Sequence, residues 1–197
     1  MTHDLQRERT LVLIKPDAVK RGLIGEVISR IERVGLKIVG MQMTKPTVEH
    51  FNKHYPGSDD FLRIIGGKTL ETYKKFEMDP AKEMGTDDPL AIGRQVRGWL
   101  MDFMTSGPIV KMAVEGLHAV STVRKIVGST MPEQAAPGTI RGDFSADSSS
   151  LANAKKRSVK NLIHASGTLE EAVQEVNLWF LSNELFPFER ADEEILF

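Results

Sequence analysis

The chain has 197 residues, a length that suits one domain or one domain enlarged by insertions. It contains no cysteine, which excludes a disulfide framework, a thiolate zinc site and a cysteine nucleophile. The formal net charge is -1, so we expect no specific affinity for nucleic acid or membrane surfaces. No apolar run is long enough to span a membrane and no secretory signal is recognisable, so we expect a cytoplasmic protein.

Strands and helices alternate along the predicted chain. Thr10 to Lys15 is an aliphatic run that stops at Pro16, which predicts a buried strand. Thr168 to Glu171 form a capping box that begins an amphipathic helix. The same reasoning predicts strands at 10–15, 36–43, 108–115 and 159–164, and helices at 26–34, 48–55, 119–126 and 169–180.

This alternation predicts a compact α/β sandwich in which helices cover one face of the sheet. Two stretches look less like core. Residues 59–93 carry Gly66-Gly67 and two Asp-Pro steps, which we interpret as punctuation between short helical pieces. Residues 145–154 form a predicted loop of Ser, Asp, Ala and Asn with little to bury.

Three short motifs have plain structural explanations. Gly67-Lys68-Thr69 lacks the earlier glycine of a phosphate-binding loop, because Leu62 stands at that position, so a helix entry or turn is the better interpretation. His50 and His54 have a zinc-binding spacing, but no third ligand completes a recognisable pattern. Arg141-Gly142-Asp143 predicts a tight turn with one useful arginine.

Several polar residues at the edges of the predicted elements could bind a polyphosphate. Arginine offers forked donors to paired oxygens, lysine offers a point charge, and hydroxyl and amide groups fill the remaining acceptors. Binding residues concentrate in connections of this kind. The pattern alone does not establish that they meet in space. The set is Lys15, Tyr55, Arg124, Thr130, Arg141, Asn161 and His164.

Four segments of the chain resemble nucleoside diphosphate kinases. One of them, Asn161-Leu162-Ile163-His164-Ala165-Ser166, is similar to the Asn-x-x-His-Gly/Ala-Ser active-site signature of that family. The order of the segments and the elements around them agree as well. The resemblance implies a ferredoxin-like βαββαβ core with an antiparallel sheet, assembled from dimers into tetramers or hexamers. The four segments are 8–19, 21–26, 137–144 and 161–166.

The resemblance also implies a ping-pong transfer of the γ-phosphoryl group from a nucleoside triphosphate to a nucleoside diphosphate. His164 matches the nucleophile, Glu175 the carboxylate that bonds its other ring nitrogen, and Tyr55 the phenol beside the imidazole. A neutral imidazole has one lone-pair nitrogen free to attack, and its tautomer is set by the partner of the other nitrogen. His118, which precedes its own helix, is the competing nucleophile and is interpreted as a loop or cap residue.

The remaining roles concern ATP and the other nucleotide substrates. Arg124, Thr130 and Arg141 match the phosphate ligands, while Lys15 and Asn161 match groups at the ribose 3′-hydroxyl and the phosphates. The resemblance implies Mg²⁺ as cofactor, carried by the nucleotide phosphates and not by a cage of protein ligands. Fixed donors and Mg²⁺ suit a loose transition state whose charge is spread over equatorial oxygens.

The chain departs from the family in three places. The domain, 1–197, carries insertions at about 59–93 and 145–156. Val96 or Arg97 stands where members of the family have an aromatic residue that stacks on the base, although Phe61 could substitute from the insertion. Gly167 stands where many members have Asp. The second insertion is predicted to be a surface loop, with a lid, a base contact or a subunit contact as the alternatives.

Two other functions fit the same fold. A nucleotide sensor or scaffold would bind nucleotides without chemistry, because fold alone does not specify a reaction. A phosphohistidine relay protein would also use His164, but its acceptor would be another protein and it would have little need for Lys15, Arg124 and Arg141.

Overall fold

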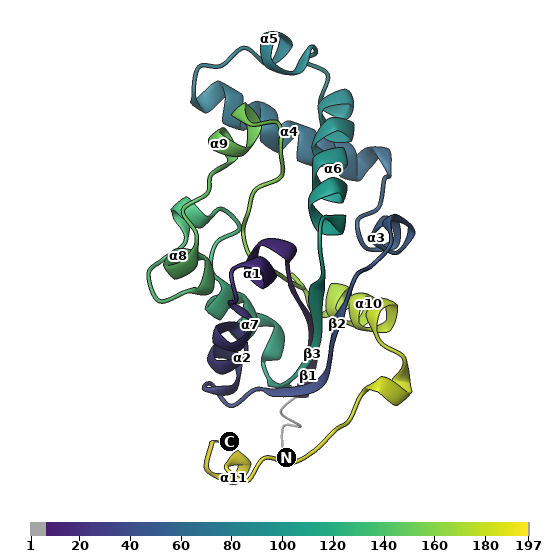
Figure 1. Ribbon diagram of the computed structural model, residues 1–197, viewed down its shortest axis with the longest axis vertical. Helices are drawn as coiled ribbons and strands as arrows, with labels where there is room; N and C mark the ends of the chain where they lie inside the picture. The colour runs from purple at the N-terminus through teal and green to yellow at the C-terminus, as the bar shows by residue number, and fades with distance from the viewer. Residues whose placement is uncertain (1–6, 197) are drawn as a thin grey trace, which may run out of the picture.

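The computed structural model describes residues 7–196 (Figure 1). Its four strands form one antiparallel sheet in the order β2-β3-β1-β4, which confirms the predicted sheet. The strands are β1 (Arg7–Ile14), β2 (Lys37–Thr44), β3 (Ile109–Leu117) and β4 (Ile163–Ala165). The helices are α1 (Pro16–Lys20), α2 (Ile24–Glu32), α3 (Val48–His54), α4 (Asp59–Lys75), α5 (Pro80–Met84), α6 (Pro89–Thr105), α7 (Ala119–Val127), α8 (Ile140–Phe144), α9 (Ser149–Ala154), α10 (Leu169–Trp179) and α11 (Glu193–Leu196), with 3₁₀ turns η1 (Pro132–Gln134) and η2 (Ser182–Glu184).

Helices cover both faces of the sheet, so the prediction of a single covered face is wrong. Central strand β1 is buried on both sides: Val12 and Ile14 pack with α2 and α7, whereas Leu11 and Leu13 pack with α3, α6 and α10. A strand that is apolar at every position, as at Leu11 to Ile14, is typical of a sheet covered on both faces. The uninterrupted apolar run from Leu11 to Ile14 therefore already indicated a sheet that is covered on both faces.

The predicted strand at 159–164 is shorter and later, at β4 (Ile163–Ala165). The reason is a turn at Leu162, whose φ of 68° lies in the left-handed region that bulky residues rarely adopt. Lys15 N donates to Leu162 O at 2.8 Å, and Leu162 N donates to the Asp17 carboxylate at 3.1 Å. These contacts hold the turn against the end of β1 and place Asn161 beside Lys15.

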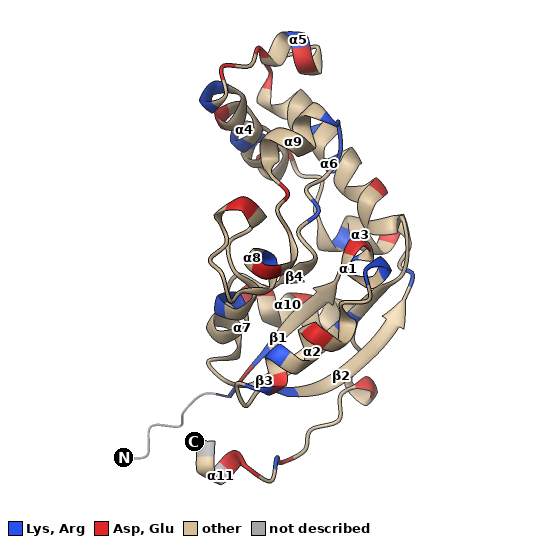
Figure 2. Ribbon diagram, turned by 60° about the vertical axis from the view of Figure 1, so that its left-hand side comes forward, with Lys and Arg blue, Asp and Glu red and all other residues tan. Residues whose placement is uncertain are grey.

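Helices α4 and α6 form a long hairpin that projects from one end of the sheet (Figures 1 and 2). The predicted breaks at Gly66-Gly67 do not occur, because α4 continues through them. Gly66 and Gly93 instead allow close packing: a Cβ on Gly66 would lie 1.8 Å from Pro89 O, and one on Gly93 would lie 2.0 Å from Leu62 O. Any larger residue at either position would force the two helices apart.

The expected loop at 145–154 contains a short helix, α9, so the loop prediction is wrong for its second half. The Ser148 hydroxyl caps this helix by accepting from Leu151 N. Ala152 and Asn153 are buried, and α9 packs against α4. The two stretches that seemed peripheral in the sequence thus contact each other beyond the end of the sheet (Figure 1).

Among the helices of residues 7–196, none has both the length and the apolar character needed to cross a membrane.

Candidate active site

His164 lies on β4, opposite Leu13 of the central strand, and its side chain is 19% exposed. Its Nε2 lies 2.9 and 3.0 Å from the two carboxylate oxygens of Glu175 on α10. An anionic carboxylate only accepts, so Nε2 carries the proton and Nδ1 keeps its lone pair. Nδ1 makes no hydrogen bond within residues 7–196, which leaves it available as a nucleophile.

Glu175 is itself held in place. The buried Ser166 hydroxyl donates to its Oε2 at 2.6 Å and accepts from Leu11 N at 3.3 Å. Burial alone would raise the pKa of Glu175, but hydrogen bonds from His164 and Ser166 and the nearby His54 ring lower it overall. Glu175 therefore remains an ionised acceptor beside His164. Ser166 belongs to the active-site signature, but no individual role had been predicted for it.

His54 is the residue that sequence reasoning missed. Its ring lies 4.6 Å from that of His164, edge to face, and Trp179 Nε1 donates to its Nδ1 at 3.3 Å. Burial and the neighbouring His164 lower the pKa of His54 to about 3, so the ring stays neutral. It supports the imidazole of His164 by packing. The only available signal was the His50–His54 spacing, which suggested a metal ligand.

Tyr55 follows His54 and lies farther from His164, with ring centroids 6.1 Å apart. Burial, together with the Glu175 carboxylate, raises the pKa of Tyr55 well above its ordinary range, so the phenol keeps its proton. It can therefore act as a neutral donor near the imidazole. Arg97 Nη2 donates to Tyr55 O at 2.9 Å and fixes the end of α3 against α6.

Lys15, Asn161 and Thr130 form a chain of hydrogen bonds beside His164. The buried Lys15 ammonium donates to Asn161 Oδ1 at 2.6 Å, and Asn161 Nδ2 donates to Thr130 O at 3.0 Å. Three segments that lie far apart in sequence, at the end of β1, after α7 and before β4, meet at this point. The structure therefore brings together three of the residues predicted to bind a nucleotide.

Arg141 joins the same group from α8. Its guanidinium donates to four main-chain carbonyls, those of Gly128, Ser129, Asn161 and Ile163. A guanidinium has five N–H donors, so one remains for another acceptor. Most of the side chain's hydrogen bonding thus holds the loop after α7 against the chain that leads to His164. Sequence reasoning had predicted only the phosphate-binding role.

The positive charges of this region lower one another's pKa values. Burial and then Arg141 lower the pKa of Lys15 to about 7. Burial and then Arg124 lower the pKa of Arg141 to about 10. Arg124 is exposed on the last turn of α7 and makes no side-chain hydrogen bond within the described residues. Cationic side chains that lower one another's pKa are typical of a site that binds an anion.

Val96 and Arg97, the residues at the expected base-stacking position, both make contacts within the protein. Val96 packs in a small cluster with Tyr73 and Ile92, and Arg97 is engaged with α3. Phe61 lines a hollow beside His164 that also holds Glu171 and Glu175. His118 lies after β3, opposite the start of β1, whereas His164 lies near the other end of that strand.

One group of three metal-capable side chains occurs among the described residues: His54, His164 and Glu175. Its nitrogen-rich donor set does not suit Mg²⁺, which prefers oxygen ligands in octahedral geometry. Gly167 N donates to the Glu171 carboxylate at 2.8 Å, and a Cβ at this glycine would lie 2.8 Å from the same oxygen. Glu171 thus occupies the space around the position where many relatives have Asp.

Comparison with known proteins decides between the families that share such a fold. The family model described as nucleoside diphosphate kinase matches residues 8–61 and 93–185. The chain belongs to the nucleoside diphosphate kinase family. It is 49% identical over 178 residues to the nucleoside diphosphate kinase of Pyrobaculum aerophilum, covering 90% of this chain and 97% of that one. It is 37% identical over 186 residues to that of Borreliella burgdorferi, covering 94% and 95% of the two chains.

Solved structures of the nucleoside diphosphate kinase family agree with this fold. The crystal structure of an NDP kinase from Pyrobaculum aerophilum matches with a TM-score of 0.89 at 46% identity, over 92% of this chain and 100% of that one. A Borrelia burgdorferi nucleoside-diphosphate kinase with bound vanadate and ADP, a transition-state mimic, matches with a TM-score of 0.77 at 37% identity, over 95% of each chain. The fold is the ferredoxin-like fold of this family, with its antiparallel sheet.

Proposed function

We propose that this chain transfers the γ-phosphoryl group of a nucleoside triphosphate to a nucleoside diphosphate through a phosphorylated His164. One observation carries the proposal: His164 has Nε2 bonded to Glu175 and Nδ1 free, in the neighbourhood of the cations Lys15 and Arg141. Membership of the nucleoside diphosphate kinase family supports the same reaction.

The first half-reaction begins with attack of the Nδ1 lone pair on the γ-phosphorus. The N–P bond forms, the bond from phosphorus to the β–γ bridging oxygen breaks, and the nucleoside diphosphate leaves with that electron pair. The Nε2 proton stays in its hydrogen bond to Glu175, which stabilises the ring as it becomes cationic. A second nucleoside diphosphate then reverses these steps and takes the phosphoryl group.

The phosphates are held by Lys15, Arg124 and Arg141, which we call the cationic group. The Lys15 ammonium and the remaining N–H of Arg141 stabilise charge on the equatorial oxygens. Arg124 contributes from the last turn of α7, and Thr130 contributes from the loop that follows this helix. We propose that Mg²⁺ enters with the nucleotide, where it neutralises phosphate charge when bound. Glu171, which lines the hollow beside His164, would be the carboxylate that contacts such an ion through water.

Labelling separates this function from its alternatives. Pure protein is incubated with γ-labelled ATP and Mg²⁺, tested for acid-labile and base-stable label, and then given GDP. The kinase acquires label and passes it to GDP. A nucleotide sensor acquires none, and a relay protein keeps its label when GDP arrives, so either result rejects the proposal.

Glu175→Gln is expected to lower kcat about tenfold to a hundredfold, because the amide loses the charge that stabilises a cationic His164 and can present the wrong tautomeric partner. The nucleotide KM should change little, since Glu175 does not belong to the cationic group. Ser166→Ala, which removes only the hydroxyl that orients Glu175, should cause a smaller loss in kcat. Equal kcat in wild type and Glu175→Gln would exclude the proposed role of the carboxylate.

Nucleotide affinity is expected to fall as pH rises from 7 to 9. Lys15 has a pKa of about 7 in the free protein, and bound phosphates favour its charged form, so binding takes up a proton in this window. The second ionisation of a phosphate, at about pH 6, is complete below it. Calorimetry in two buffers of different ionisation enthalpy measures the proton uptake. Lys15→Met should bind more weakly and show no such dependence, whereas a flat wild-type profile would contradict the prediction.

The proposal also covers the oligomeric state of the enzyme and the cell compartment in which it works. We propose a homo-oligomer built from dimers, as a tetramer or hexamer, because β2 is an edge strand that exposes Met41 and Met43. The absence of cysteine fits the reducing cytoplasm. Sedimentation of the pure protein measures the subunit number, and a monomer at all concentrations would exclude the oligomer.

A further inference from the structure

Helix α10 carries Glu175 and Trp179 on one face, because residues four apart lie on the same side of a helix. Glu175 faces His164, as described above. Trp179 is 5% exposed, and its indole Nε1 donates to His54 Nδ1 on α3 at 3.3 Å. The proposed mechanism gives neither Trp179 nor this hydrogen bond a part.

The indole of Trp179 is held in one orientation. Lys111 Nζ on β3 donates to Trp179 O at 2.7 Å, which fixes the end of α10 against the sheet. The ring centroid of His50 lies 4.3 Å from that of Trp179, edge to face, and that of Phe51 lies 5.6 Å away. Side chains packed this closely stay in a single rotamer. The direction of the indole N–H toward His54 is therefore set by the core.

The hydrogen bond from Trp179 selects the tautomer of His54. An indole N–H only donates, so His54 Nδ1 carries a lone pair and the neutral ring carries its proton on Nε2. His54 Nε2 is buried and has no hydrogen-bond partner within residues 7–196. An unpaired buried donor costs free energy, and such costs concentrate at functional sites. The fold thus leaves one N–H unpaired while it keeps Nδ1 unprotonated.

A proton on His54 Nδ1 would act on Glu175. His54 Nδ1 lies 3.5 Å from Glu175 Oε1, the same oxygen that lies 2.9 Å from His164 Nε2. With its proton on Nδ1, His54 would donate to this carboxylate and compete with His164 for it. A doubly protonated His54 would also place a positive charge beside His164, whose ring lies 4.6 Å away and becomes cationic during transfer.

We propose that Trp179 is a positioning residue that keeps Glu175 available to His164 by holding the proton of His54 on Nε2. This inference rests on the proposed function, because it concerns the carboxylate that stabilises the cationic ring of His164. Trp179 acts through His54 and is not itself a catalytic residue.

The charges around His54 also keep its ring neutral. Burial and then His164 lower the pKa of His54 to about 3, with smaller contributions from Lys15 and His50, whereas Glu175 acts to raise it. If the Trp179 N–H were lost, Glu175 would be the remaining partner of Nδ1, and the pKa of His54 would rise. The hydrogen bond and the surrounding charges therefore work in the same direction.

Nitrogen-15 NMR of the imidazoles in the full chain tests the tautomer, because protonated and unprotonated ring nitrogens have well-separated chemical shifts. The spectrum of His54→Phe identifies the His54 signals among those of the 5 histidines. In the wild type at neutral pH, Nε2 should carry the proton. In Trp179→Phe the proton should move to Nδ1 and the pKa of His54 should rise. A wild-type His54 with its proton on Nδ1 would overturn the proposal, whatever the variants do.

Kinetics test the consequence for Glu175. Trp179→Phe should lower kcat about tenfold, the effect of weakening one hydrogen bond to a charged group, and leave the nucleotide KM unchanged. Adding His54→Phe to this variant removes the competing N–H and should raise kcat again by about threefold or more. A purely structural role of Trp179 predicts the opposite, a further fall in the double variant. Unchanged kcat in Trp179→Phe, or no recovery in the double variant, would overturn the proposal.

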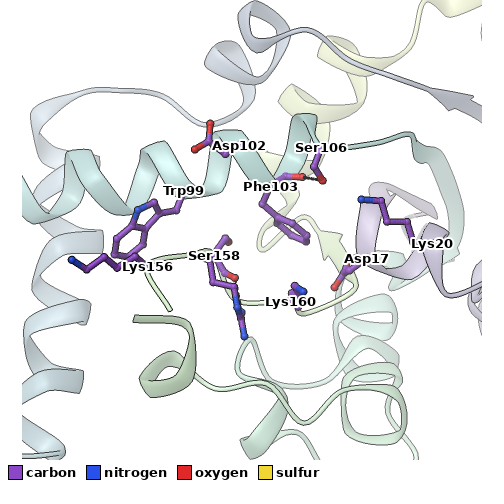
Figure 3. Close-up of a pocket in the computed structure, with 10 residues that line it drawn as sticks. Asp17, Lys20, Trp99, Asp102, Phe103, Ser106, Lys156, Ser158 and Lys160 are labelled. Carbon is purple, nitrogen blue, oxygen red and sulfur yellow. Dashed lines mark hydrogen bonds between the residues drawn. The ribbon is translucent and has the colours of Figure 1, made fainter. Parts of the chain in front are cut away.

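The matched control is Trp99→Phe, because Trp99 is the other of the 2 tryptophans in the chain. Trp99 lines a cavity between α6 and the segment before β4, together with Phe103 and Ser158 (Figure 3). This cavity shares no lining residue with the hollow that contains His54 and His164. Trp99→Phe should therefore leave the tautomer and the pKa of His54 unchanged. A change in the His54 signals as large as that in Trp179→Phe would reject the specific role of Trp179.

Thermal melting of each variant establishes that it is folded, and the tautomer in the wild type decides the proposal if Trp179→Phe is not. The NMR measurements need no chemistry, so they stand apart from the labelling test. A wild type that carries the His54 proton on Nε2 but acquires no label from ATP would reject the proposed function and leave the assignment of the tautomer intact.

Discussion

His164→Gln is expected to abolish phosphoryl transfer, by roughly 10⁴-fold or more, because it removes the Nδ1 lone pair that attacks the γ-phosphorus. The glutamine amide can still donate to Glu175, so the pocket should keep its shape. No acid-labile label should form with ATP. Binding of ADP should stay within about threefold of the wild-type value, because the cationic group and its hydrogen bonds are untouched.

The matched control is His118→Gln. His118 begins α7 in the left-handed conformation and is exposed at the opposite end of the sheet from Lys15. Its replacement should leave transfer unchanged. If His164→Gln turned over nucleotides while His118→Gln did not, the nucleophile would have been misassigned and the proposed mechanism would fail.

The strands of the core were predictable because the residues within each strand are themselves enough to indicate that it is buried. Three predicted strands agree with β1, β2 and β3 within a few residues, since aliphatic and β-branched runs specify a strand without help from distant residues. The capping pattern at Thr168 likewise gave the start of α10, where its hydroxyl accepts from Glu171 N. Such signals need only a few neighbouring positions.

The features that failed depend on contacts from distant parts of the chain. Leu162 adopts a left-handed turn because Lys15 and Asp17 hold its main chain, and nothing in its own neighbourhood predicts that. Helix α9 forms in a polar stretch because it packs on α4, which lies about 80 residues earlier. Propensity is a weak guide where tertiary packing supplies the stability.

In the candidate site, too, the identity of the residues was predictable, whereas their contacts with distant parts of the chain were not. Resemblance pointed to the residues around His164, and the structure brings Lys15, Asn161, Thr130 and Arg141 together. Distances could not be predicted, so neither the contact of His54 with His164 nor the double use of Arg141 was foreseen.

Arg141→Gln is expected to destabilise the protein as well as weaken nucleotide binding. The side chain is 4% exposed and satisfies four main-chain carbonyls, which glutamine cannot reach together. Leaving buried acceptors unpaired should lower the free energy of unfolding by about 3 kcal/mol. For a chain of this size that corresponds to a fall in Tm of roughly 6–12 °C, which calorimetry measures directly.

Arg124→Gln is the matched variant, because it removes the same charge from an exposed side chain that has no hydrogen bond within the described residues. It should leave Tm unchanged and raise the KM for nucleotides about tenfold, the effect of one lost charge-assisted hydrogen bond. Arg141→Gln should combine that loss with the fall in Tm. Equal melting temperatures for the two variants would mean that the four carbonyl contacts of Arg141 do not hold the loop after α7, and the guanidinium would then serve the phosphates alone.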